Sequence, residues 1–241
     1  MYGDVETGAS RRYLELIAGR LDTEFCLVGG WAVHNLVREG YMRLTGREYL
    51  GSRDIDLGLP SPEGVVEVEA LLVGDMGFSP RSFRFVKQLH FETGEELSDE
   101  AAKRLPLPII FPLYVDVMLP TSGEELRERL GFVPPDEPLL ARVFDDIGHS
   151  TSVDIGGLIV EVPTPDVLMA MKLNSVVNRF EDHKRIKDLC DLTALALYSG
   201  EDSRPLVEAV LEISDGTKLA QLSTALSRAD VDLVGTILGT D

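Results

Sequence analysis

The sequence predicts an α+β fold in which a mixed β-sheet is flanked by helices and followed by a C-terminal helical region. Two observations lead to this class. Before Pro163, short strand-like runs occur between stretches in which apolar residues have helical spacing. After Pro165 the strand-like runs stop and only helical spacing remains. The sequence therefore predicts one domain over 1–164 and a helical domain over 165–241.

The first part of the chain predicts a helix, a strand, a tight turn and a second helix. Apolar residues at helical spacing predict the first helix over 10–21. The run 25–28 is wholly apolar and ends in Gly29 and Gly30, as a buried strand entering a turn would. Helical spacing resumes over 31–38.

The middle of the chain predicts two further strands. The polar, glycine-containing segment 40–51 is expected to be a loop, and 54–59 alternates polar and apolar residues as a half-buried strand does. Helical spacing follows over 62–76. Alternation over 84–91 predicts another strand, and the acidic stretch 92–99 predicts a solvated turn.

The remainder of the predicted first domain holds a further strand and a hairpin. The apolar run 114–119 is closed by Pro120, which is typical of a strand end. Ser122 with Glu125 three residues later resembles a capping box that opens a short helix. Two adjacent glycines within 153–162 predict a hairpin. The predicted C-terminal helices are 166–180, 186–198, 205–213 and 218–226.

Charge and cysteine content exclude several classes of protein. The formal net charge of −18 argues against a general nucleic-acid coat or a membrane-binding patch, although a local basic groove is compatible with it. Cys26 and Cys190 are far apart, without Cys or His at metal-ligand spacing, so neither a disulfide framework nor a structural zinc site is expected. No apolar stretch is long enough for a membrane span, and we expect a cytoplasmic protein without membrane partners.

Three aspartates are candidates for metal binding. Asp54 and Asp56 are separated by one residue on a predicted strand, so both side chains point to one face, where a cation such as Mg²⁺ would relieve their repulsion. The alternative is two solvated aspartates on an edge strand. Asp116 lies in an otherwise apolar strand and would supply a third ligand if that strand were placed beside the first; alternatively, it faces solvent.

Gly29 and Gly30 are candidates for phosphate binding. They precede a predicted helix, whose N-terminus carries unpaired N–H groups and a partial positive charge. Two glycines would let a triphosphate approach the backbone closely. The alternative is an ordinary strand-to-helix turn. No phosphate loop of the Gly-x-x-x-x-Gly-Lys-Ser/Thr type and no Gly-x-Gly-x-x-Gly motif is present.

The order of these features resembles the nucleotidyltransferase superfamily with the polymerase-β-like core. The shared pattern is a doubled glycine, then Asp54-x-Asp56, then the distant Asp116. The resemblance implies that the three aspartates hold two Mg²⁺ ions, which bind a nucleoside triphosphate and activate a substrate hydroxyl. Ser52 is expected to contact phosphate.

The C-terminal part narrows the resemblance to the abortive-infection nucleotidyltransferase toxins of AbiEii type. Lys172, Arg179, Lys187 and Asp191 match the C-terminal signature of that family, and Gly29-Gly-Trp-Ala32 with Ser52-Arg-Asp-Ile-Asp56 matches its N-terminal one. The resemblance covers roughly residues 25–195. It implies that Lys172 binds the triphosphate together with Arg179 and Lys187, and that Asp191 acts in the same cleft.

The alternative without a functional role for this C-terminal segment is an amphipathic helix with a charged face. Asp191 would then only cap the helix or pair with Lys187, four residues before it. Against this, Lys172 falls within an apolar series, where an unpaired ammonium is costly. The segments 38–53 and 172–187 carry net charges of +2 and +3, which a polyanion-binding cleft would need.

Together these features predict a metal-dependent enzyme that moves a nucleoside monophosphate from a triphosphate such as ATP to a hydroxyl acceptor. By resemblance the acceptor is RNA, a tRNA 3′ end, and the protein is the toxin of a pair with a cognate antitoxin. A small-molecule acceptor, as in antibiotic nucleotidyltransferases, is the alternative enzyme. A non-catalytic nucleotide-binding or partner-binding protein on the same fold is the alternative outside enzymes.

Overall fold

The computed structural model describes residues 2–145, 148–214 and 216–240, and the chain forms two compact units. One, here called the sheet unit, comprises Tyr2–Trp31 and Gly51–Val162. The other, the helical unit, comprises Ala32–Leu50 and Pro163–Asp241. The sheet unit ends at Val162, the helical unit resumes at Pro163, and the segment Ala32–Leu50 belongs to the helical unit.

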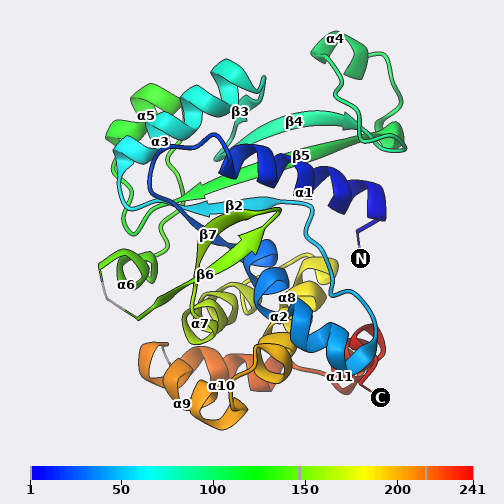
Figure 1. The fold of residues 1–241 in the computed structure, drawn as a ribbon, viewed down its shortest axis with the longest axis vertical. Helices are drawn as coiled ribbons and strands as arrows, with labels where there is room; N and C mark the ends of the chain where they lie inside the picture. The colour runs from blue at the N-terminus through cyan, green and yellow to red at the C-terminus, as the bar shows by residue number, and fades with distance from the viewer. Residues whose placement is uncertain (1, 146–147, 215, 241) are drawn as a thin grey trace. The chain divides into compact units, whose positions relative to one another are not determined.

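The sheet is mixed, as predicted, and the strand order is β3-β4-β5-β2-β1-β7-β6 (Figure 1). Strand β1 is antiparallel to β2 and parallel to β7, β2 is parallel to β5, and β4 is antiparallel to both β3 and β5. The strands are β1 (Cys26–Val28), β2 (Ile55–Gly58), β3 (Ser79–Arg81), β4 (Arg84–His90), β5 (Ile110–Met118), β6 (Ser150–Ile155) and β7 (Leu158–Pro163).

One face of the sheet forms the core of the sheet unit. Along β5, Leu113, Val115 and Val117 are fully buried, whereas the alternate residues are only half-buried. Helix α1 (Asp4–Ala18) contributes Leu14 and Ile17, both fully buried, to this core. The other face, here called the half-buried face, carries Asp116, because successive strand residues point to opposite sides.

The sheet unit contains several further helices. They are α3 (Pro62–Glu69), continued by a π-helical turn over Ala70–Asp75, α4 (Asp99–Ala102), a 3₁₀ turn over Leu107–Ile109, α5 (Glu125–Leu130) and α6 (Leu140–Asp145). Helix α5 begins at Glu125 with Glu124 at its N-cap, so the predicted capping box at Ser122 is wrong. The Ser122 backbone N–H instead donates to the Asp136 carboxylate, at 2.6 Å.

The helical unit is built on α2 (Gly29–Thr45), whose first residues belong to the sheet unit, and on five C-terminal helices. The predicted loop 40–51 is wrong over its first half, because α2 continues to Thr45. Gly40 is needed inside this helix, since a Cβ there would overlap the Tyr198 carbonyl. The C-terminal helices are α7 (Pro165–Val176), α8 (Asp182–Tyr198), α9 (Ser203–Ile213), α10 (Gly216–Ala225) and α11 (Arg228–Leu238).

Most predicted elements are present with shifted ends. The strands predicted over 25–28, 54–59, 84–91 and 114–119 and the hairpin around Gly156 are confirmed. The helix predicted to reach residue 180 ends at Val176, and β3, α4, α6 and α11 were not predicted. Cys26 and Cys190 are both free and buried. Within the described residues no helix combines the length and the apolar character that a membrane crossing requires.

Candidate functional site

The residues singled out from the sequence fall into two groups, one in each unit. The sheet unit holds Gly29, Gly30, Ser52, Asp54, Asp56 and Asp116, whereas the helical unit holds Lys172, Arg179, Lys187 and Asp191. The first group lies at the start of α2, at and just before the start of β2, and near the end of β5.

Asp56 and Asp116 are neighbours across the sheet. The parallel strands β2 and β5 pair the Cα of Asp56 with the Cα of Asp116. Adjacent strands lie ~4.8 Å apart, and paired residues share a face, so the two carboxylates emerge side by side. Both side chains are half-buried, while the residue before each, Ile55 and Val115, is fully buried on the opposite face. The alternation in the sequence thus places both acids on one accessible surface.

The doubled glycine lies directly beside Asp56. Val28, the last residue of β1, is paired with Asp56, so that the chain turns into α2 next to this carboxylate. Gly29 has a φ of +66°, and a Cβ at this position would overlap the Asp56 carboxylate. Only glycine meets both conditions without strain. The N-terminal N–H groups of α2 are therefore brought to the acidic side chain that the strand presents.

A continuous row of paired residues crosses five strands at this point. Across β3 and β4, Arg81 is paired with Arg84. The β4–β5 register continues from Arg84 to Asp116. Asp116 is paired with Asp56 of β2, and Asp56 with Val28 of β1. Two arginines therefore lie next to two aspartates on the half-buried face. We refer to these five residues as the cross-strand row.

Arg84 is a site residue that sequence reasoning missed. Its Nε lies 3.0 Å from Asp116 Oδ1, and its guanidinium stacks at 4.5 Å from the ring centroids of both Phe83 and Tyr114. The alternation of 84–91 predicted that Arg84 is on a strand. Its pairing with Asp116 depends on the β4–β5 register, which no local pattern in the sequence reveals.

Asp54 differs in position from the other two aspartates. It precedes β2 rather than lying on it, and its Oδ1 is 3.4 Å from Arg53 Nε. Arg53 also lies 3.7 Å from Glu6 of α1. Ser52, two residues before Asp54, is buried with 7% of its surface exposed. The Asp54 carboxylate is thus held toward Arg53.

The donor set suits Mg²⁺, with two carboxylates rather than three. In the part of the chain that the structure describes, no three His, Cys, Asp or Glu residues lie close enough together to hold an ion. Mg²⁺, however, is usually bound by one or two carboxylates together with substrate phosphates and water. Asp56 and Asp116, paired on adjacent strands, provide such a set.

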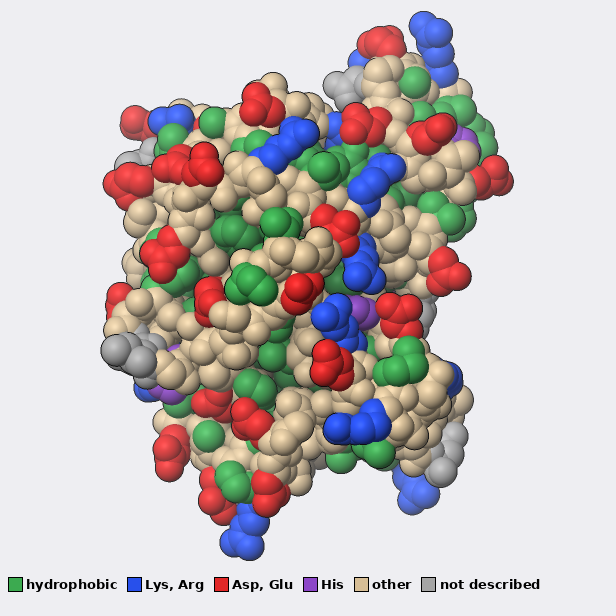
Figure 2. Space-filling model, viewed as in Figure 1, with side chains coloured by type: hydrophobic (Ala, Val, Ile, Leu, Met, Phe, Trp, Pro, Cys, Tyr) green, Lys and Arg blue, Asp and Glu red, His purple; other side chains and the backbone are tan. Residues whose placement is uncertain are grey.

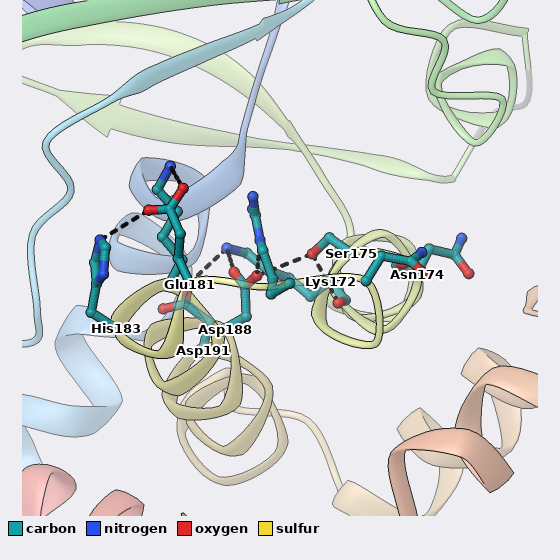
Figure 3. A network of polar contacts seen from close by, with 10 residues as sticks. Lys172, Asn174, Ser175, Glu181, His183, Asp188 and Asp191 are labelled. Carbon is teal, nitrogen blue, oxygen red and sulfur yellow. Dashed lines mark hydrogen bonds and ion pairs between the residues drawn. The ribbon is translucent and has the colours of Figure 1, made fainter. Parts of the chain in front are cut away.

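The second group forms a buried ionic network between α7 and α8 (Figure 3). Lys172 Nζ lies 2.7 Å from Asp188 Oδ1 and 2.8 Å from Asp191 Oδ2. Arg179 Nε is 2.9 Å from Asp188 Oδ2, and the Ser175 hydroxyl donates to the same oxygen at 3.2 Å. The buried ammonium of Lys172 is therefore bound by two carboxylates.

Asp191 is the centre of the rest of this network. It is fully buried, pairs with Lys187, and accepts a hydrogen bond from the Tyr49 hydroxyl at 2.8 Å. The pairing with Lys187 is the one predicted for an ordinary amphipathic helix without a functional role. Among the described members of the network, the prediction of site residues missed Tyr49, Ser175 and Asp188. Tyr49 lies in a polar segment without a motif, whereas Asp188 was visible beside Lys187.

Electrostatic attraction outweighs desolvation in this network. Burial alone would lower the pKa of Lys172, but Asp191 and Asp188 hold that pKa well above its usual range. Burial alone would raise the pKa of Asp188, but Lys172 and Arg179 hold it below its usual value. Burial, then Asp191, raises the pKa of Tyr49. These shifts keep Lys172 and Asp188 charged and Tyr49 neutral near neutral pH.

Of the predicted cations in the helical unit, Arg179 is the most accessible. Its side chain is 40% exposed, compared with 10% for Lys172 and 9% for Lys187. The visible face of the molecule carries many acidic side chains with Lys and Arg among them, in keeping with the net charge of −18 (Figure 2). An accessible arginine anchored by a buried aspartate is suited to anion binding.

Comparisons with known proteins give low similarity. No protein-family model matches the sequence, and no curated protein matches it. An antigenic nucleotidyltransferase-like protein from Paracoccidioides brasiliensis is 14% identical, with a TM-score of 0.47 and 93% of each chain covered.

Two structures of the antibiotic-resistance factor ANT(2″)-Ia are similar at the same level. Its solution structure is 14% identical with a TM-score of 0.49, covering 90% of this chain and 96% of that chain. Its crystal structure in complex with adenylyl-2″-tobramycin is 14% identical with a TM-score of 0.47, covering 91% and 99%.

Proposed function

We propose that this protein is a nucleotidyltransferase that moves a nucleoside monophosphate from a nucleoside triphosphate to a hydroxyl acceptor. The observation that carries the proposal is the pairing of Asp56 with Asp116 on the half-buried face, beside the Gly29 turn that opens α2. The structure thus brings a two-carboxylate set and a helix N-terminus, taken from three separate segments, to one place. A hard cation and a polyphosphate are the ligands that these two features bind best.

The residues of the sheet unit would divide the work as follows. Asp56 and Asp116 would hold Mg²⁺, which neutralises charge on the phosphates when it is bound. The N–H groups at Gly29 and Gly30 would donate to the phosphate oxygens. The acceptor hydroxyl, oriented by a hydrogen bond to Asp116, forms a bond to the α-phosphorus, while the bond to pyrophosphate breaks. The hydroxyl proton is released to water.

Asp54 and Ser52 have supporting places in this proposal. Asp54 would join the metal ligands once its carboxylate exchanges Arg53 for the ion. Ser52 is proposed as an additional phosphate contact. Support for both comes from their position in the segment that leads into β2. Asp54 is two residues before Asp56, and Ser52 is four residues before it.

In the helical unit, the predicted roles of Lys172, Arg179, Lys187 and Asp191 stay proposals. Arg179 is supported as a phosphate ligand by its exposure and by its anchoring to Asp188. A phosphate contact of Lys172 would require its ammonium to exchange Asp188 or Asp191 for the phosphate. Lys187 and Asp191 are proposed to hold this arrangement in place through their buried pair.

For the acceptor we propose RNA, at a tRNA 3′ end, with the activity controlled by a cognate antitoxin. The proposal is supported by the motif order shared with the AbiEii-type toxins and by the positive segments 38–53 and 172–187. A small-molecule acceptor and a non-catalytic nucleotide-binding protein are the outcomes that the experiment must separate.

The test is a transfer assay with each of the four α-labelled triphosphates, with and without Mg²⁺. Acceptors are bulk tRNA in one series and small polyhydroxy or aminoglycoside compounds in the other. The proposal predicts Mg²⁺-dependent label in tRNA and release of pyrophosphate. Label only in small molecules would establish the enzyme and refute the RNA acceptor. Triphosphate binding without any transfer would refute the proposed enzymatic activity and favour a nucleotide-binding protein.

A further inference from the structure

A cavity of about 420 Å³ lies at the sheet edge beside the cross-strand row. It is lined by Arg81 of β3, by Val86 and Gln88 of β4, and by Ile110 of β5. The segment around α4, with Ala102 and Lys103, covers it on another side. All of these residues belong to the sheet unit, and the volume is within the range of small-ligand sites.

Val86 and Gln88, which line the cavity, are on the same face of the sheet as Asp116. Val86 is paired with Tyr114, two residues before Asp116 on β5, and residues two apart share a face. Arg81 both lines the cavity and is a member of the cross-strand row, separated from Asp116 by Arg84 alone. Two strand spacings of ~4.8 Å each separate Arg81 from Asp116, so a ligand of the size of a sugar phosphate bound in the cavity could extend to Asp116.

The charge of the lining is unusual for this chain. Among the described residues that line the cavity none is Asp or Glu, although the protein has 41 acidic and only 23 basic residues. Three cations line it, and two of them have acidic partners outside the lining. Lys87 pairs with Glu96 at 2.9 Å, and Lys103 pairs with Glu100 at 2.9 Å.

Because Lys87 and Lys103 are in ion pairs, Arg81 is the lining cation that is available to a ligand. It is exposed, and within the described residues it has no ion-pair partner. Its register partner is another cation, Arg84, which is held by Asp116. Two arginines side by side favour an anion with several oxygens, since a guanidinium donates bidentately to phosphate.

From these observations we infer that the cavity is the acceptor subsite and that the acceptor carries a phosphate group recognised by Arg81. This inference rests on the proposed transfer reaction. The apolar lining from Val86, Ala102 and Ile110 suits a sugar or base next to that phosphate. A cationic acceptor, rich in amines, would meet the charge of Arg81 and is disfavoured by like charge.

The test compares variants of the full chain in an equilibrium binding experiment without triphosphate. Two probes separate the sources of the phosphate: ribose 5-phosphate, and a tRNA with an intact 3′ end. Arg81→Gln should weaken binding of whichever probe binds by about tenfold, the loss of one charge-assisted hydrogen bond. Ala102→Trp, which fills the cavity and leaves its charge unchanged, should weaken binding as well. Arg104→Gln is the matched control, because Arg104 is next to Lys103 but does not line the cavity.

The outcomes distinguish this inference from the proposed function. If Arg81→Gln and Ala102→Trp bind both probes as the wild type does, or no worse than Arg104→Gln, the inference is wrong, whether or not transfer occurs. If neither probe binds the wild type, the inference is also wrong, whether or not an aminoglycoside binds. If the variants lose probe binding and no transfer is found with any acceptor, the cavity binds phosphate esters but the proposed reaction is refuted.

Discussion

The guanidinium of Arg84 lies against the carboxylate of Asp116, with 3.0 Å between Nε and Oδ1. Asp116 is paired on its other side with Asp56, so that Arg84 offsets part of the repulsion between two neighbouring carboxylates. A divalent cation that binds Asp116 must therefore compete with an internal cation held between two aromatic rings.

Removing Arg84 should raise the affinity for a divalent cation. Arg84→Gln takes away the competing charge, and a partly exposed ion pair of this kind is worth about 1 kcal/mol, or roughly fivefold in affinity. Binding of Mn²⁺ without nucleotide, followed by its paramagnetic signal, measures the effect. Arg81→Gln is the control, because Arg81 is one strand further from Asp116. Equal Mn²⁺ affinities in the wild type and Arg84→Gln would contradict this account of the site.

A side chain at Gly29 should disrupt both the fold and the site. Gly29→Ala forces a Cβ into the Asp56 carboxylate at a φ of +66°, whereas Gly46→Ala imposes the same backbone strain, at +69°, with no atom within 4 Å. The control should lose ~1 kcal/mol of unfolding free energy. We expect a clearly larger loss for Gly29→Ala, together with loss of triphosphate binding. Urea titration with a nucleotide-binding assay checks this, and equal losses in both variants would count against the overlap.

The buried network should be sensitive to the loss of Lys172. Lys172→Met leaves Asp188 and Asp191 buried with fewer cations, which typically costs about 3–5 kcal/mol of unfolding free energy. Lys103→Met is the matched control, because it breaks the exposed Lys103–Glu100 pair, which is worth less than ~1 kcal/mol. Urea titration followed by circular dichroism compares the two. Similar costs for both variants would show that the network contributes little.

The same network predicts a dependence of stability on acid pH. The folded pKa of Asp188 is lowered, so its contribution is complete above the unfolded value of about 3.9 and is lost as pH falls through the folded pKa. The raised pKa of Lys172 acts only at alkaline pH, above the ordinary lysine range. Asp188→Asn should therefore flatten the fall of the thermal midpoint below about pH 4.

Asp182→Asn is the control for this titration, because the Asp182 side chain is 94% exposed. Thermal midpoints measured between neutral and acid pH should fall along the wild-type curve in this variant. An unchanged acid limb in Asp188→Asn would refute the assignment to Asp188.

Local patterns in the sequence were sufficient for the strands that carry the carboxylates, but not for their full length. Strand β5 begins at Ile110, four residues before the predicted start, and runs through Pro112. Proline is tolerated there because β2 pairs only with the later residues of β5, so the proline nitrogen lacks a partner strand. Because β2 does not extend as far as Pro112, the proline fits in β5. The sequence of β5 alone does not reveal how far β2 extends.

The helix errors have equally specific causes. Gly40 was interpreted as a break, but it lies inside α2 where the Tyr198 carbonyl approaches the backbone. A capping box was assigned to Ser122 and missed at Ser227, whose side chain accepts from Asp230 N–H at the start of α11. A serine followed three residues later by an acidic residue thus forms a capping box at Ser227 but not at Ser122. Tertiary context decides whether it forms.

For the candidate site, the sequence predicted which residue types share a face but not which ions they meet. The spacing of Asp54 and Asp56 and the apolar surroundings of Lys172 both indicated that partners are required. The partners, Arg53 for Asp54 and Asp188 with Asp191 for Lys172, depend on loop and helix packing. Such pairings follow from three-dimensional register, which periodicity alone does not fix.

The most direct measurement is the rate of nucleotide transfer by charge-neutral variants of the paired carboxylates. Asp56→Asn and Asp116→Asn keep the shape of each side chain and remove the metal-binding charge, and transfer should fall by about a thousandfold or more. Asp154→Asn, on the β6–β7 hairpin, is the matched control and should transfer as the wild type does. Wild-type rates in Asp56→Asn or Asp116→Asn, with the fold intact by circular dichroism, would contradict the proposal that this pair is the catalytic centre.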